Sequence, residues 1–167
     1  MIAVRCSVRP RGFTLIEMLV TVTIVALMST IAFPMLELAE RRSNERELRE
    51  ALRQIRTALD NYKQAVDEGR IVEETKGTGY PPSLDILVEG VVDAKSPSKD
   101  KKLFFLRRIP RDPLNQAMAS GAESGAPTWG LRSYASAATA PQPGADVFDV
   151  YSLSAALGLN GTPYKEW

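Results

Sequence analysis

The hydrophobic positions of this chain form three successive patterns. From Phe13 to Leu36 the residues are apolar, apart from threonine, serine and the single charge of Glu17. Charged residues begin at residue 37, and an apolar stripe then recurs at three- and four-residue spacing. Its members are Leu48, Ala51, Leu52, Ile55, Ala58, Leu59, Tyr62, Ala65 and Val66. Because few periodic stretches follow residue 69, the pattern predicts one very long helix and a separate head.

The first apolar segment is long enough to cross a membrane. At about 1.5 Å per helical residue, positions 13–36 span ~36 Å, which exceeds a hydrocarbon core of ~30 Å. Residues 1–12 contain Arg5, Arg9 and Arg11 and no acidic residue, and the positive-inside rule therefore predicts a cytoplasmic N-terminus. The chain beyond Leu36 is expected outside the cytoplasm, which is the periplasm in a Gram-negative cell.

Glu17 is a residue that an ordinary membrane helix does not need. A carboxylate at the centre of such a helix costs about 2.5–3.5 kcal/mol on insertion scales, and less near an end, so it is a functional candidate whose partner must be found. The apolar run itself contains no lysine or arginine. A secretory signal cleaved after Thr30-Ile31-Ala32 and a plain membrane anchor are two interpretations of the segment, and both leave Glu17 unexplained.

The residues from Arg11 to Val20, RGFTLIEMLV, resemble the type IV prepilin signal. The resemblance implies that a prepilin peptidase cuts between Gly12 and Phe13 and methylates the new N-terminal Phe13. It also implies that, in a filament, the Phe13 ammonium of one subunit pairs with Glu17 of its neighbour. Either charge would be costly to bury alone, so the pair would set the axial register of the subunits.

The helix is expected to continue past the membrane to Glu68, with Gly69 as its terminator. Pro34 lies near the end of the apolar run, where the prepilin-like family commonly has a proline, and is expected either to kink the helix or to mark the membrane edge. Residues 37–47 are nearly all polar and are expected between the membrane and the head. The stripe that begins at Leu48 is expected to dock onto the head.

The remaining chain predicts a loop-rich head. Ser83 is expected to cap a short helix that ends at Val88, and two strands are expected at 131–135 and 147–153. A small antiparallel sheet packed on the long helix would bury the apolar stripe. The predicted fold is therefore α+β and pilin-like, with a leader at 1–12, a membrane helix at 13–36, an amphipathic helix at 37–68 and a head at 69–167.

Several head segments resemble the major pseudopilin family of type II secretion systems. In chain order they are Tyr80-Pro81-Pro82-Ser83-Leu84, the run LRRIPRDP at 106–113, Asp149-Val150-Tyr151-Ser152-Leu153 and Trp167. The resemblance implies a structural subunit of a pseudopilus, a filament that is assembled from the inner membrane and helps to move folded proteins through the outer membrane. The implied partners are further copies of the chain, prepilin peptidase, other pseudopilins and the inner-membrane assembly platform.

Calcium is a possible cofactor by the same resemblance, because the family generally has a calcium-binding loop after the last strand. Here Leu153 is followed by residues 154–161, SAALGLNG, without a carboxylate. Calcium requires about six to eight oxygen ligands, so no calcium or other metal is predicted. Asp146 and Asp149 lie nearby, but their odd spacing directs them to opposite faces of a strand. We expect a structural role for them at the surface.

Composition excludes several classes of function. The 21 basic and 20 acidic residues give a net charge of +1, which argues against a nucleic-acid partner. The chain has no histidine and only one cysteine, Cys6, and no catalytic residues are predicted. Two alternatives remain open. One is a type IV pilin or minor pilin for adhesion or motility, and the other is a membrane-anchored periplasmic enzyme or binding domain.

Overall fold

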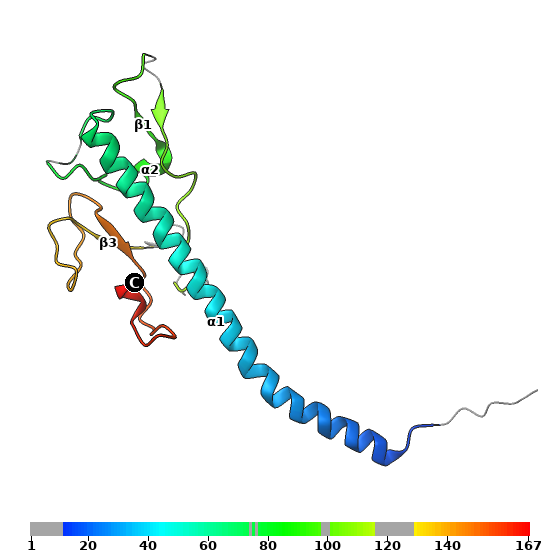
Figure 1. Cartoon of the computed structure of the whole chain (residues 1–167). Coiled ribbons are helices and arrows are strands. Elements are labelled where there is room, and N and C mark those ends of the chain that lie inside the picture. The colour runs from blue at the N-terminus through cyan, green and yellow to red at the C-terminus, as the bar shows by residue number, and fades with distance from the viewer. Residues whose placement is uncertain (1–11, 74, 76, 98–100, 116–128) are drawn as a thin grey trace, which may run out of the picture. The chain divides into compact units, whose positions relative to one another are not determined.

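The computed structural model describes residues 12–73, 75, 77–97, 101–115 and 129–167. The predicted leader therefore lies outside the described residues, except for Gly12. The chain divides into two compact units, Met1–Arg41 and Arg42–Trp167. The first helix, α1, extends from Leu15 to Asp67 and contributes residues to both units (Figure 1).

The end of α1 confirms Gly69 as the helix terminator. Gly69 has a φ of 66°, a conformation that glycine adopts without steric cost. Its N–H donates to the Val66 carbonyl at 2.8 Å, and the Arg70 N–H donates to the Ala65 carbonyl at 2.9 Å. These two bonds satisfy carbonyls that the helix end would otherwise leave without a partner.

The core of the second unit lies along the apolar stripe of α1. Eight of its nine predicted members are buried, and Val66 packs partly buried against them. They form one cluster with residues from the rest of this unit, including Leu87, Val147, Val150 and Tyr164. Burying a side chain of this size stabilises the fold by about 1.5–3 kcal/mol. The prediction that the stripe beyond Leu48 docks onto the head is therefore confirmed.

The head contains short elements arranged as two antiparallel ribbons. Its helix α2 is Ile86–Glu89, and a 3-10 turn is formed by Tyr164–Glu166. Strand β1 (Val91–Val92) pairs with β2 (Lys102–Leu103), and β3 (Gly130–Arg132) pairs with β4 (Asp149–Tyr151). Both pairs are antiparallel. The α+β fold class, with a long N-terminal helix and small antiparallel sheets, is confirmed.

Two local predictions differ from the structure. Helix α2 begins at Ile86, after Asp85 rather than Ser83, and its N-cap makes no side-chain hydrogen bond. The last ribbon is also shorter than predicted. Beyond Arg132 the backbone leaves the ladder, because the Ser133 N–H donates to the Gln142 carbonyl.

The ribbon also requires a glycine at position 130. Gly130 is paired directly with Tyr151. A Cβ on Gly130 would lie only 2.3 Å from two ring atoms of Tyr151, so any larger residue would push the ring away and disturb the pairing.

An ion pair fastens the segment that follows α1. Arg70 donates from Nη2 to Asp93 Oδ2 at 2.8 Å, and the Ala94 N–H donates to the Arg70 carbonyl at 2.8 Å. The hydrogen bond from Arg70 holds the pKa of Asp93 below its usual value of 3.8.

We predict that Asp93→Asn lowers the melting temperature at neutral pH and that this difference shrinks in acid. Because the folded-state pKa of Asp93 is depressed, the stabilisation is present above the unfolded-state pKa and is lost as the pH falls through the folded value. Thermal melts of the full chain in detergent at pH 7 and at about pH 2 would check this. An equal difference at both pH values would contradict the assigned role of the carboxylate.

Candidate assembly site

The start of α1 is closed by a reciprocal pair of hydrogen bonds between Thr14 and Glu17. The Glu17 N–H donates to Thr14 Oγ1 at 3.3 Å, and the Thr14 N–H donates to Glu17 Oε2 at 3.5 Å. This is a capping box, in which each side chain satisfies a backbone donor at the helix N-terminus. The Thr-x-x-Glu spacing is the sequence signal for this box, a second role for Glu17 beside the predicted pairing between subunits. The predicted site residues Gly12, Phe13 and Glu17 lie within six positions of one another at this end of the chain, and all three are exposed.

The apolar part of α1 is exposed within the chain. Phe13, Leu15 and Ile16 are 76%, 84% and 69% exposed, and α1 is the one described helix long and apolar enough to cross a membrane. Its hydroxyl groups donate to carbonyls one turn earlier in the helix: Thr21 to Met18, Thr23 to Leu19, Ser29 to Val25 and Thr30 to Leu27. Because these polar groups are satisfied internally, the surface is suited to lipid or to other apolar helices.

Pro34 lies inside α1, which is continuous through this position. Proline lacks the N–H that would bond to the carbonyl of Thr30. The hydroxyls of Ser29 and Thr30 donate to Val25 and Leu27 and do not replace that bond. The kink at Pro34 stays a prediction.

The C-terminal segment of the head is fastened to α1 through Glu45. This side chain is buried at 5% exposure, and its Oε1 accepts from the Leu159 N–H at 2.6 Å and from the Tyr164 hydroxyl at 3.0 Å. Arg49 lies 3.6 Å from the other carboxylate oxygen. The prediction that residues 37–47 all lie between membrane and head is therefore wrong for Glu45, because its partners come from more than one hundred residues further along the chain.

We predict that Glu45→Ala loosens the C-terminal segment. The substitution removes the acceptor of the Leu159 N–H and leaves the buried Tyr164 hydroxyl unsatisfied, and an unsatisfied buried group costs about 1–3 kcal/mol. Limited proteolysis of the full chain should cleave the variant around residues 157–162 at least tenfold faster than the wild type. Glu47→Ala, at an exposed position two residues away, is the matched control. Equal cleavage rates for all three proteins would contradict the role given to Glu45.

The loop after β4 is closed by the chain's own groups. The Gly158 N–H donates to the Thr162 carbonyl, the Gly161 N–H donates to the Gly158 carbonyl, and Asn160 Oδ1 accepts from the Thr162 N–H. Glu45 accepts from Leu159 in the same loop. Among the described residues there is no group of three acidic, histidine or cysteine side chains that could hold a metal ion.

Asp146 and Asp149 have structural partners, but the predicted surface position is wrong for Asp146. Asp146 is buried at 4% exposure, where it accepts from Ser133 Oγ at 2.5 Å and from the Tyr134 N–H at 3.2 Å. Asp149 is partly buried between two arginines and pairs with Arg56 at 2.8 Å and Arg132 at 3.2 Å. Asp146 precedes β4, which begins at Asp149, so the alternation rule of a strand does not apply to it.

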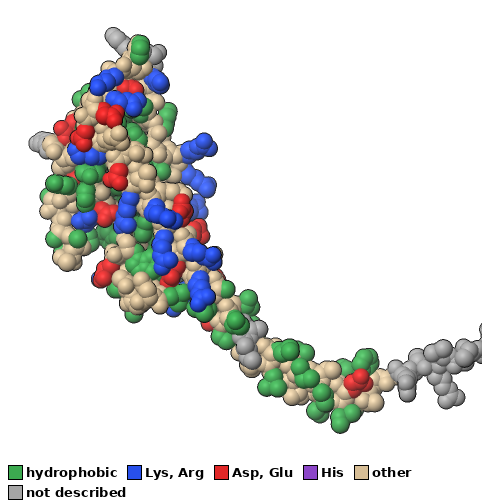
Figure 2. All heavy atoms as spheres, viewed as in Figure 1, with side chains coloured by type: hydrophobic (Ala, Val, Ile, Leu, Met, Phe, Trp, Pro, Cys, Tyr) green, Lys and Arg blue, Asp and Glu red, His purple; other side chains and the backbone are tan. Residues whose placement is uncertain are grey.

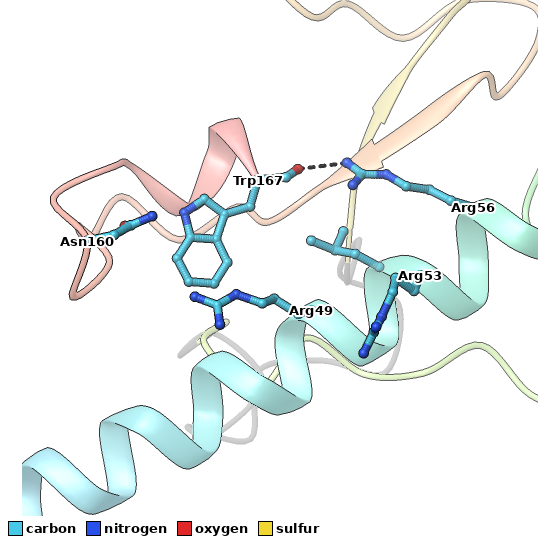
Figure 3. Close-up of a pocket in the computed structure, with 6 residues that line it drawn as sticks. Arg49, Arg53, Arg56, Asn160 and Trp167 are labelled. Carbon is cyan, nitrogen blue, oxygen red and sulfur yellow. Dashed lines mark hydrogen bonds between the residues drawn. The ribbon is translucent and has the colours of Figure 1, made fainter.

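A groove on the second unit is lined by arginines of α1 and by Trp167. It encloses about 420 Å³ between Arg49, Leu52, Arg53, Arg56, Asn160 and Trp167. Arg49 lies over the indole ring of Trp167, 4.4 Å from its centre, and Arg56 donates to the main-chain oxygen of Trp167 at 2.7 Å (Figure 3). Arg53 points away from the indole in this view. The contacts of Arg49 and Arg56 fasten Trp167 to α1, while Arg53 faces outward.

The chain is similar to known proteins in its N-terminal segment and over part of its length. The family model of the prokaryotic N-terminal methylation motif matches residues 9–33. The chain is also similar to the type II secretion system core protein G of Aeromonas hydrophila, with 27% identity over 105 residues that cover 63% of this chain and 68% of that protein. No solved structure matches the chain.

The motif and the relative together support a pseudopilin-like prepilin family. Together they are consistent with a subunit of the pseudopilin or type IV pilin kind. The motif and the apolar part of α1 indicate a single-pass anchor in the inner membrane.

Proposed function

We propose that this chain is a structural subunit of a type II secretion pseudopilus, with its head in the periplasm and no catalytic role. The observation that carries the proposal is the exposed apolar start of α1, which has a single carboxylate, Glu17, within a matched N-terminal methylation motif. Such an apolar surface is unfavourable in water. It is buried in the membrane before assembly and against other apolar helices in the centre of a filament. The similarity to core protein G favours secretion over motility.

Proteolytic processing creates the positively charged partner that the Glu17 carboxylate otherwise lacks. Cleavage between Gly12 and Phe13 by prepilin peptidase creates an ammonium group at Phe13, which the same enzyme methylates. In the filament this ammonium pairs with Glu17 of a neighbouring subunit. The pair removes two otherwise unpaired charges from an apolar environment and opposes packing in any other register. Pro34 kinks α1 where the helix leaves the apolar core.

The test of the secretion role is a chromosomal deletion of the gene. We expect the proteins that are normally secreted to accumulate in the periplasm, and plasmid-borne wild-type chain to restore their export. Surface motility and adhesion should be unchanged. Normal secretion together with a loss of motility or adhesion would instead favour a type IV pilin.

We also propose that the head needs no calcium. The support is the loop after Leu153, where hydrogen bonds to Glu45 and Asn160 replace the acidic ligands that a calcium site requires. The melting temperature of the full chain in detergent should be the same, within about one degree, in excess calcium and in excess chelator. A stabilisation of several degrees by calcium would overturn this proposal, since a ligand that binds the native state raises its stability.

A further inference from the structure

One face of α1 in the second unit carries a stripe of arginines. They recur at alternating four- and three-residue spacing: Arg42, Arg46, Arg49, Arg53 and Arg56. Because seven residues are almost two helical turns, these side chains lie along one face over about 21 Å of helix. Figure 2 shows lysine and arginine side chains gathered over part of α1. The whole chain has a net charge of only +1, so positive charge is concentrated on this arginine stripe.

Two members of the arginine stripe have structural roles inside the chain. Arg56 is half-buried and pairs with Asp149 at 2.8 Å, and it also donates to two main-chain oxygens. Arg49 lies 3.6 Å from Glu45 and stacks on the indole of Trp167. The Arg49 side chain is nevertheless 51% exposed. A guanidinium group has five N–H donors, so Arg49 retains donors for a further partner.

The other three arginines are only weakly engaged. Among the described residues the Arg42 side chain makes no hydrogen bond or ion pair, and the Arg46 side chain donates only to the Arg42 carbonyl. Arg53 pairs with Glu50, where the two side chains are 74% and 54% exposed, and such pairs exchange partners readily. Like charges four residues apart destabilise a helix. A local rule broken with so little compensation inside the chain points to a role outside it.

The groove beside Trp167 adjoins the same stripe and offers donors rather than acceptors. No acidic side chain is among its lining residues in the part of the chain that the structure describes. The indole N–H of Trp167 is buried without an acceptor. The Asn160 side chain points toward this indole (Figure 3), and its oxygen already accepts from the Thr162 N–H. The groove therefore lacks the negative charge and the acceptors that an acidic ligand would bring.

We propose that the arginine stripe and this groove bind an extended acidic segment of another protein. One carboxylate enters the groove between Arg49 and Arg53, and the next ones along the segment meet Arg46 and Arg42. Side chains on one side of an extended chain repeat every 6.6 Å or about that, while neighbouring arginines of the stripe are about 4.5 or 6 Å apart along the helix. Carboxylates on alternate residues can therefore each meet a guanidinium group, which binds them in a bidentate manner.

The surroundings of the stripe favour protein carboxylates over other polyanions. Single-stranded nucleic acid binds by stacking its bases on aromatic rings, and the indole face of Trp167 is already covered by Arg49. A helix that lies on a lipid surface exposes an apolar face beside its basic one. Between positions 42 and 57 every apolar residue of α1 is buried in the head. The site belongs to a single subunit, so it goes beyond the proposed function and can be tested without a filament.

The experiment measures peptide binding to the full chain purified in detergent. The probe is a fluorescein-labelled peptide of eight residues in which glutamate alternates with serine, followed by fluorescence anisotropy. We expect saturable binding that is at least tenfold weaker for the same peptide with glutamine in place of glutamate. Arg46→Gln and Arg53→Gln should each weaken binding of the glutamate peptide at least threefold. Glu50→Gln should tighten it at least twofold, because it removes the acid that competes for Arg53.

Arg108→Gln is the matched control, because it makes the same charge change at an exposed head position outside the stripe and should leave binding unchanged. Equal binding of the two peptides, or unchanged binding by both stripe variants, would overturn the site. So would an equal loss in Arg108→Gln. Stronger competition by an oligothymidylate or by glycerol phosphate than by unlabelled glutamate peptide would assign the stripe to nucleic acid or to lipid headgroups instead. None of these results touches Phe13 or Glu17, so the proposed function stands or fails separately in the secretion test.

Discussion

Replacing Glu17 by glutamine is expected to reduce filament yield more than tenfold while membrane insertion and cleavage remain normal. Glutamine can still close the capping box with Thr14, because either glutamate or glutamine serves at this position. The substitution therefore preserves the helix start that the structure shows and deletes only the charge. In the filament it leaves the ammonium of a neighbouring Phe13 without its partner in an apolar environment, at a cost of several kcal/mol.

The measurement is the amount of chain in sheared filament fractions at equal levels of processed subunit. Thr14→Val is the matched control, because it removes the hydroxyl that caps the helix and keeps the Glu17 charge. We expect this control to lose less than threefold. Normal filaments from both Glu17→Gln and Glu17→Ala would show that the charge pair does not drive assembly, and Glu17 would then serve mainly the capping box.

Gly12→Val is expected to abolish processing and leave the uncleaved precursor in the membrane. The fold does not need glycine at this position, because a Cβ there would meet no atom within 4 Å and the backbone φ is not positive. Any effect of valine therefore arises in the peptidase, where the absent side chain allows close approach to the scissile backbone.

An immunoblot that resolves precursor from processed chain gives the result directly. The processed fraction should fall from nearly complete to undetectable, and filaments should disappear with it. Gly12→Ala adds a single methyl group and should retain part of the processing. If the valine variant were processed at the wild-type rate, the scissile bond would have to lie elsewhere.

Local sequence signals were sufficient for the elements that depend on neighbouring residues. The three- and four-residue spacing of apolar side chains from Leu48 onward identified the buried face of α1, and Gly69 identified its end. The capping box was also available in the sequence, as Thr14 and Glu17 at the required spacing. It was missed because the charge of Glu17 was interpreted only as a membrane residue that needed an external partner.

The remaining features depend on contacts that no local pattern contains. Glu45 is buried because Leu159 and Tyr164 reach it from the end of the chain, although the residues on either side of it in the sequence, Asn44 and Arg46, are polar. Asp146 is buried by its bond to Ser133, thirteen residues away. One sheet was expected and two separate ribbons are found, because strand periodicity says which face is apolar and not which strand is the partner.

The central claim is that this chain is a processed subunit of a filament. Mass spectrometry of the N-terminal peptide from purified sheared filaments tests it most directly. We expect a chain that begins with N-methylated Phe13 and is the main component of the filament. An intact chain from Met1 to Trp167, found only in the membrane of cells that contain an active prepilin peptidase, would contradict it.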